Sequence, residues 1–145
     1  MPHSWPFSVM NVFTYGSLMY NSVWSRVVAR AYPQKIGVVH GFQRLKVRHE
    51  PYPGLIRGQE AVEGVVYLEV AAADLARLDR FEGPLYRREE VEVVCTGGER
   101  VAAFVYLIRD EYHGILDGAW SRVEFEREGL AEFETRYVGF DRSDQ

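Results

Sequence analysis

Near its N-terminus the chain reads Val12-Phe13-Thr14-Tyr15-Gly16-Ser17-Leu18-Met19, an apolar run that stops at a glycine turn. The run is typical of a buried strand. A glycine after such a strand lets the backbone approach a ligand closely, and successive free amides at a strand-to-helix turn form a concave anion site. We therefore expect Tyr15, Gly16, Ser17 and Leu18 to wall a binding pocket. An ordinary glycine turn with a tyrosine packed in the core remains the alternative.

A second informative stretch lies far along the chain and reads Leu78-Asp79-Arg80-Phe81-Glu82-Gly83-Pro84-Leu85-Tyr86-Arg87-Arg88. Glu82 follows Leu75 by seven residues and Leu78 by four, so helical spacing puts its carboxylate on the face of the core leucines. Burial disfavours the charged form and raises a glutamate pKa from about 4.3. A carboxyl shifted in this way can take and return a proton near neutral pH.

The sequence leaves a purely structural role for Glu82 open. The helix could fray at Gly83 and turn the carboxylate outward. The carboxylate could also form an ion pair with Arg80, Arg87 or Arg88, because perturbed carboxylates are often structural. In either case Glu82 would support the fold and take no part in chemistry.

Length and charge bound the class of protein. The chain has 145 residues, of which 47% are hydrophobic and 14% aromatic. It is long enough for one core and too short for two ordinary domains, so we expect a single domain over residues 1–145 with its core at about residues 10–140. The net charge of −4 and the pI near 5.6 provide no basic field for a phosphate backbone. We expect no nucleic-acid partner.

The residue types that hold metals or cofactors show no suggestive spacing. The four histidines, His3, His40, His49 and His113, do not fall at metal-ligand spacing. The lone cysteine, Cys95, sits in a strand-like run and predicts a buried structural thiol. The sequence contains neither a Gly-x-Gly-x-x-Gly motif nor a Gly-x-Ser-x-Gly elbow. We expect no metal, no nucleotide cofactor and no serine nucleophile.

Membrane and export signals are also missing from the sequence. No apolar run approaches the ~20 residues that span a bilayer. The first residues lack the basic and apolar regions of a secretory signal. We expect a cytoplasmic protein without a membrane partner.

The remaining patterns predict more strands than helices. Strands are expected at residues 10–14, 34–47, 63–70, 89–95 and 101–107, with a short one after the proline loop at 51–56. Helices are expected at residues 21–28, at 71–81, and from 121 to just before Gly139. Because the strands do not alternate regularly with helices, the pattern predicts an α+β domain and not a doubly wound parallel sheet.

Local signals refine these elements. Asn21 is expected to cap the first helix, and Ser121 begins a segment with capping-box spacing. Gly37 and Gly41 mark bulges or turns in the strand around them. The last helix is expected to place four residues on one face: Val123, Leu130, Phe133 and Tyr137.

Together the two opening stretches resemble the gamma-glutamylcyclotransferase-like superfamily, in particular its gamma-glutamylamine-cyclotransferase-like branch. The family string Leu-Asp-x-Phe/Tyr-Glu-Gly-x-x-Tyr-x-Arg is present in full from Leu78 to Arg88. The segment Tyr52-Pro53-Gly54-Leu55-Ile56 resembles the Tyr-Pro segment of the branch. The resemblance implies a small mixed-strand barrel with two or three helices outside it and an active site at its mouth.

The resemblance also implies an activity. A cofactor-independent enzyme of this kind closes a gamma-glutamyl group to 5-oxoproline and releases an amine or amino acid. Glu82 would be the catalytic acid/base, the turn from Tyr15 to Leu18 would cradle the glutamyl part, and Tyr86 would bond the substrate or steady Glu82. The expected partner is a small gamma-glutamyl compound, and the protein is expected to be a monomer or homodimer.

Two other functions fit the same sequence. The scaffold could act on another gamma-glutamyl compound, for instance by releasing a protecting gamma-glutamyl group from a biosynthetic intermediate. It could also be a non-catalytic small-molecule-binding or interaction domain. The observation that separates an enzyme from a binding domain is whether the Glu82 carboxylate reaches a pocket bounded by the amides of Tyr15 to Leu18.

Overall fold

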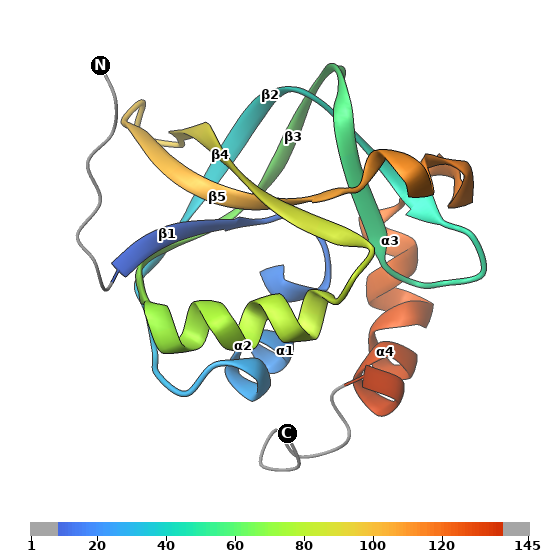
Figure 1. Cartoon of the computed structure of the whole chain (residues 1–145), viewed down its shortest axis with the longest axis horizontal. Helices are drawn as coiled ribbons and strands as arrows, with labels where there is room; N and C mark the ends of the chain where they lie inside the picture. The colour runs from blue at the N-terminus through green and yellow to red at the C-terminus, as the bar shows by residue number, and fades with distance from the viewer. Residues whose placement is uncertain (1–8, 138–145) are drawn as a thin grey trace.

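The computed structural model describes residues 9–137 and is drawn in Figure 1. In chain order the elements are β1 (Val9–Thr14), η1 (Ser17–Met19), α1 (Asn21–Val27), β2 (Gln34–Val47), β3 (Pro53–Ala71), α2 (Ala72–Glu82), β4 (Tyr86–Cys95), β5 (Arg100–Ile108), η2 (Asp110–Ile115), β6 (Leu116–Ala119), α3 (Arg122–Glu124), η3 (Phe125–Gly129) and α4 (Leu130–Tyr137). The end predicted for the last helix, before Gly139, lies outside the described residues.

The strands form one sheet that closes into a barrel. Their order is β3-β1-β5-β4-β2-β6, and β2 also pairs with β3, so five strands complete a ring and β6 extends from β2. β1 runs parallel to β5, with Val12 opposite Phe104, whereas the other pairs are antiparallel. In Figure 1, α1 and α2 lie together on one side and the C-terminal helices lie apart from them. The predicted α+β class with a mixed-strand barrel is confirmed.

Alternate residues of the strands enter two apolar cores. In β1, Val12 packs into the cluster shared with the helices, and Phe13 packs into a cluster made almost entirely of strand residues. This alternation arises because neighbouring side chains of a strand point to opposite faces. Trp24 of α1 and Leu78 of α2 complete the first cluster. Cys95 is buried in the second, as its strand-like setting predicted.

Helix α2 leads directly to the pocket described below. It confirms the helix predicted at residues 71–81, with the same face buried: Leu75 is 3% exposed and Leu78 is fully buried. The helix stops after Glu82, where Gly83 takes a φ of +79° and a ψ of −169°, a backbone conformation that is open to glycine and rare for other residues. Its first turn is anchored by Asp74, which accepts hydrogen bonds from the Ala29 amide at 2.8 Å and the Tyr32 hydroxyl at 2.6 Å.

The long hairpin of β2 and β3 corrects two expectations. The predicted short strand and the predicted strand at 63–70 are one strand, which bends where Phe42 of β2 faces both Arg57 and Glu60. Gly41, with a φ of +86°, lies at this corner and confirms the bulge expected there. The interruption expected at Gly37 is wrong. A Cβ at Gly37 would lie 2.5 Å from a Val93 methyl, so this glycine allows close strand packing in a regular ladder.

The two predicted helix caps and the predicted common face of the last helix are confirmed only in part. Ser121 Oγ accepts a hydrogen bond from the Glu124 amide at 3.1 Å, so the predicted cap is confirmed. Asn21 is not a cap, because it is the first residue of α1 and follows the N-cap. Val123 is 67% exposed, whereas Phe125 and Phe133 are each 3% exposed. The π turn η3 adds a residue to one turn and changes which residues share a face, so the predicted inward position of Val123 is wrong.

Substitution of Ser121 by Ala is expected to destabilise the protein by about 1 kcal/mol, because the Glu124 amide loses its acceptor. Urea denaturation monitored by circular dichroism measures the change. The control, Val123→Ala, removes an exposed side chain and should change the free energy of unfolding by less than about 0.5 kcal/mol. Equal losses in both variants would contradict the assigned cap.

Candidate active site

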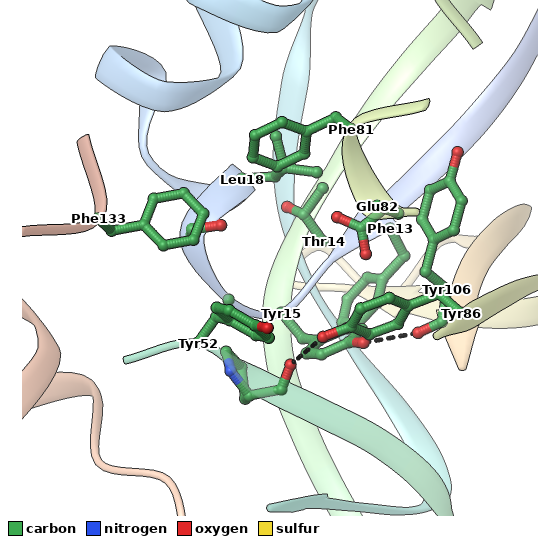
Figure 2. A pocket seen from close by; sticks show the side chains of 13 residues that line it. Phe13, Thr14, Tyr15, Leu18, Tyr52, Phe81, Glu82, Tyr86, Tyr106 and Phe133 are labelled. Atoms are coloured by element: carbon green, nitrogen blue, oxygen red, sulfur yellow. Dashed lines mark hydrogen bonds between the residues drawn. The ribbon is translucent and has the colours of Figure 1, made fainter. Parts of the chain in front are cut away.

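A pocket opens where α2 ends, beside the turn that follows β1 (Figure 2). Its lining comes from six separate segments of the chain and consists of Phe13, Thr14, Tyr15, Gly16, Ser17, Leu18, Tyr52, Pro53, Phe81, Glu82, Tyr86, Tyr106 and Phe133. All six residues that the sequence nominated for the site are in this lining. The Glu82 carboxylate and the turn from Tyr15 to Leu18 therefore line the same pocket.

Glu82 is the acid/base candidate in this pocket. Its side chain is half-buried, and Figure 2 shows it among the lining residues. Burial, and to a smaller degree the charge of Asp79, raise the pKa of the Glu82 carboxyl to about 8. Among residues 9–137 it has no ion-pair partner, because Arg88 pairs with Asp79 and Arg87 with Glu89. The ion pairs considered as the structural alternative for Glu82 are therefore not formed.

Asp79 is held in place one turn before Glu82. Its Oδ1 accepts a hydrogen bond from the Tyr106 hydroxyl at 2.7 Å and lies 2.8 Å from Nε of Arg88. These contacts join α2 to β4 and β5. They fix a negative charge near Glu82, and this charge adds to the rise in the Glu82 pKa.

The turn after β1 is a single 3-10 turn. The Met19 amide donates to the Gly16 carbonyl at 3.0 Å. From outside the turn, the Tyr67 hydroxyl donates to the Leu18 carbonyl at 2.9 Å. The first amides of a helical turn have no partner inside it, so those of Gly16, Ser17 and Leu18 form no hydrogen bond within this turn.

Gly16 allows this turn to press against the start of β3. A Cβ at Gly16 would lie 2.7 Å from Cδ and 2.8 Å from Cγ of Pro53. Real Cβ atoms essentially never come so close to another heavy atom, and the proline ring cannot swing away. The glycine is therefore required by close packing of two pocket walls.

The tyrosine hydroxyls of Tyr15 and Tyr86 both donate to main-chain carbonyls. Tyr15 donates to Tyr106 O at 2.6 Å, and Tyr86 donates to Pro53 O at 2.9 Å; both bonds are dashed in Figure 2. Burial raises the pKa of both phenols well above 10, so they stay neutral. The Tyr15 oxygen also takes part in a hydrogen bond with the Leu55 main chain. With its proton engaged, the Tyr86 hydroxyl oxygen can still accept a hydrogen bond from a ligand.

Sequence reasoning predicted Tyr15 and Tyr86 but missed other aromatic residues of the lining. Phe81 stands directly before Glu82 at the Phe/Tyr position of the family string, a signal that could have identified it. Tyr106 of β5 and Phe133 of α4 had no local signal, because an aromatic residue in a strand or helix usually packs in the core. Only the tertiary contacts bring them to the pocket.

Metal-ligand clusters and membrane-spanning helices are absent from residues 9–137. No group of three or more His, Cys, Asp or Glu side chains in this range could hold a metal ion. Within the same range, no helix has both the length and the apolar character needed to cross a bilayer. The lining of the pocket supplies one carboxyl group, main-chain amides and tyrosine hydroxyls.

A closed mixed-strand barrel whose pocket holds a carboxyl with a pKa raised by burial, without an ion-pair partner among residues 9–137, beside a glycine turn defines a class of small-molecule pocket. The family "Gamma-glutamyl cyclotransferase, AIG2-like" matches residues 12–122. This chain belongs to that family.

Individual relatives agree with the family assignment. Protein AIG2 C of Arabidopsis thaliana is 32% identical over 117 residues, which cover 79% of this chain and 71% of that protein. The solution structure of an Arabidopsis thaliana protein has a TM-score of 0.71 at 30% identity, covering 93% of this chain and 82% of that one. A solved gamma-glutamyl cyclotransferase has a TM-score of 0.66 at 17% identity, covering 94% of this chain and 90% of that one, and shares the fold.

Proposed function

We propose that this protein is a gamma-glutamylcyclotransferase-type enzyme. It cyclises a gamma-glutamyl group to 5-oxoproline and releases an amine or amino acid, with Glu82 as general acid/base. The observation that carries the proposal is the Glu82 carboxyl, which has a pKa of about 8 and shares a pocket with the turn from Tyr15 to Leu18. Membership of the gamma-glutamyl cyclotransferase, AIG2-like family supports the same reaction class.

The proposed reaction is an intramolecular aminolysis. Ionised Glu82 takes a proton from the substrate α-ammonium, and the freed amine attacks the γ-carbonyl carbon. A C–N bond forms, Glu82 gives its proton to the departing nitrogen, and the C–N bond to the leaving amine breaks. The ionised Glu82 then takes the second proton from the ring nitrogen, which becomes the lactam N–H, and passes this proton to solvent or to the freed amine. An α-ammonium has a pKa of about 7.7 to 8.0, close to that of Glu82, so the first transfer is almost free of energetic cost.

The turn after β1 has the complementary role in this proposal. Its amides hold the substrate α-carboxylate or the oxyanion that develops on the γ-carbonyl, where one donor contributes about 2.7 to 4 kcal/mol. Nucleophile and electrophile belong to one molecule, so alignment in the pocket can supply about 7 to 11 kcal/mol of the barrier reduction.

Mass spectrometry of 5-oxoproline tests the proposal. Purified protein is incubated with gamma-glutamyl amides of amino acids and simple amines, and product is followed against a protein-free control, because gamma-glutamyl compounds can also cyclise spontaneously. Catalysed release is expected for at least part of the panel. Rates equal to those without protein would contradict the enzyme and favour a non-catalytic binding domain.

The pH dependence of kcat/KM is expected to change in Asp79→Asn. The rate should rise with pH as Glu82 ionises in the free enzyme, with an apparent pKa near 8. Because the Asp79 charge raises that pKa, its removal should move the rising limb toward lower pH. Asparagine can still accept the hydrogen bond from Tyr106. The exposed Asp117→Asn is the matched control, and an unshifted limb in Asp79→Asn would refute the electrostatic coupling.

A further inference from the structure

One side of the pocket is an aromatic wall made of Tyr52, Phe81 and Phe133. These residues come from the loop before β3, the end of α2, and α4. The Phe133 ring lies 6.0 Å from Tyr52 at 79° and 6.0 Å from Phe81 at 68°, so it meets both neighbours edge to face. Figure 2 shows the wall on the side away from Tyr86 and Tyr106.

The wall is fixed by the packing of the C-terminal helices. Phe133 is 3% exposed, and its ring lies 6.2 Å from that of Phe125 in the preceding π turn. A Cβ at Gly129 would lie 3.0 Å from Cβ of Pro51, so the helices press closely on the loop that carries Tyr52. Phe133 also lies beyond residue 122, where the family match ends. The family match therefore covers Tyr52 and Phe81 of the wall but not Phe133.

The charge of the pocket restricts what can lie against this wall. Among the described residues, Glu82 is the one charged side chain in the lining. An amino acid as leaving group would bring its own carboxylate into the pocket with no lysine or arginine of the lining to pair with it. An unpaired charge in an apolar site is unfavourable, whereas an aromatic group gains from edge-to-face contacts.

We propose that the aromatic wall selects gamma-glutamyl amides whose leaving amine carries an aryl or other apolar group and no carboxylate. The proposal rests on the function proposed above and names its substrate class. The glutamyl part occupies the side of the turn and Glu82, and the apolar part of the amine lies against Phe133. Glu82 returns its proton to the departing nitrogen, so the amine leaves neutral and its ring leaves the wall.

Three substrates separate the effect of the aromatic ring from the effect of the carboxylate. Gamma-glutamyl phenethylamide has the ring without a carboxylate, gamma-glutamyl phenylalanine adds the carboxylate to the same skeleton, and gamma-glutamyl methylamide lacks the ring. We expect kcat/KM for the phenethylamide to exceed both others by about 10-fold or more, the scale of pocket selectivity for apolar groups. The proposal would be overturned if kcat/KM for the phenylalanine derivative or for the methylamide equalled that for the phenethylamide.

Variants of the wall provide the structural test. Phe133→Ala is expected to lower kcat/KM for the phenethylamide by about 10-fold to 100-fold and for the methylamide by less than about 3-fold. Phe133→Leu keeps an apolar side chain and replaces the alanine variant if that variant does not fold. Val123→Ala, at an exposed residue of the C-terminal helical segment, is the control. Equal losses for both substrates in a folded variant would assign Phe133 a merely structural role.

A binding measurement keeps this proposal distinct from the reaction itself. Calorimetric titration of Glu82→Gln should give tighter binding of the phenethylamide than of the phenylalanine derivative, and Phe133→Leu in the same background should weaken the first. Turnover of the methylamide without any preference in rate or binding would overturn the wall proposal alone. A preference in binding without turnover of any substrate would support the wall and contradict the catalytic function.

Discussion

Glu82→Gln is expected to lose turnover by about 10²-fold to 10⁴-fold, the contribution typical of a positioned general acid or base. Glutamine keeps the shape of the side chain and removes its ability to accept a proton. The loss should appear in kcat, because proton transfer occurs in the chemical step. Release of 5-oxoproline measures it, and Glu111→Gln, an exposed glutamate on η2, is the matched control. Substantial activity in a folded Glu82→Gln variant would refute the assigned role.

The same variant should change how stability depends on pH. The folded protein holds the Glu82 proton up to about pH 8, whereas an ordinary glutamate loses it near 4.5. Stability of the wild type therefore falls as pH rises through this window, because the unfolded chain binds fewer protons than the folded one. Glutamine avoids this loss, so Glu82→Gln should be more stable than wild type at pH 9 by at most about 5 kcal/mol.

Near pH 4 the advantage of the glutamine should be absent, because the carboxyl is protonated in both the folded and the unfolded chain. Denaturation curves at pH 4, 6 and 9 would follow the change. An equal difference in stability at every pH would contradict the raised pKa, even if the variant were inactive.

Gly16→Ala is expected to lower kcat/KM by about 10²-fold, the effect of moving catalytic groups by about 1 Å. The new methyl group would lie 2.7 Å from the Pro53 ring and would push the turn, with its amides, away from Pro53. Such overpacking should also lower the free energy of unfolding by about 1 to 3 kcal/mol. Activity assays and thermal melts on the same preparation separate the two effects.

Gly114→Ala is the control for this substitution. A Cβ at Gly114 would have no heavy atom within 4 Å, and Gly114 does not line the pocket. The control should keep wild-type turnover and near wild-type stability. If Gly16→Ala behaved like Gly114→Ala, the close contact between the turn and Pro53 would not be required for function.

Much of the site could be predicted from local patterns. The apolar run before Gly16 predicted β1, and the spacing of Glu82 from Leu75 and Leu78 predicted a carboxylate on the inner face of a helix. Both signals depend on residues only a few positions apart in the chain, because strand and helix periodicities are set by local backbone geometry. The same is true of the cap at Ser121.

Other features could not be read in this way. The exposed position of Val123 depends on a π turn that no propensity pattern marks. Asp79 and Glu82 could each pair with Arg88, and the structure pairs Arg88 with Asp79. The Glu82 carboxyl is therefore left without a counter-charge among the described residues. The wall residue Phe133 comes from a helix about fifty residues after Glu82.

The sequence by itself determined the α+β class, the glycine turn, and a carboxylate beside the apolar face of α2. These features follow from side-chain periodicity and the conformational freedom of glycine, which act over a few residues. The tertiary structure alone decided that the carboxylate has no ion-pair partner among the described residues, that its pKa reaches about 8, and that an aromatic wall lines the same pocket. Desolvation and charge pairing depend on which distant segments meet, and closure of the barrel brings them together.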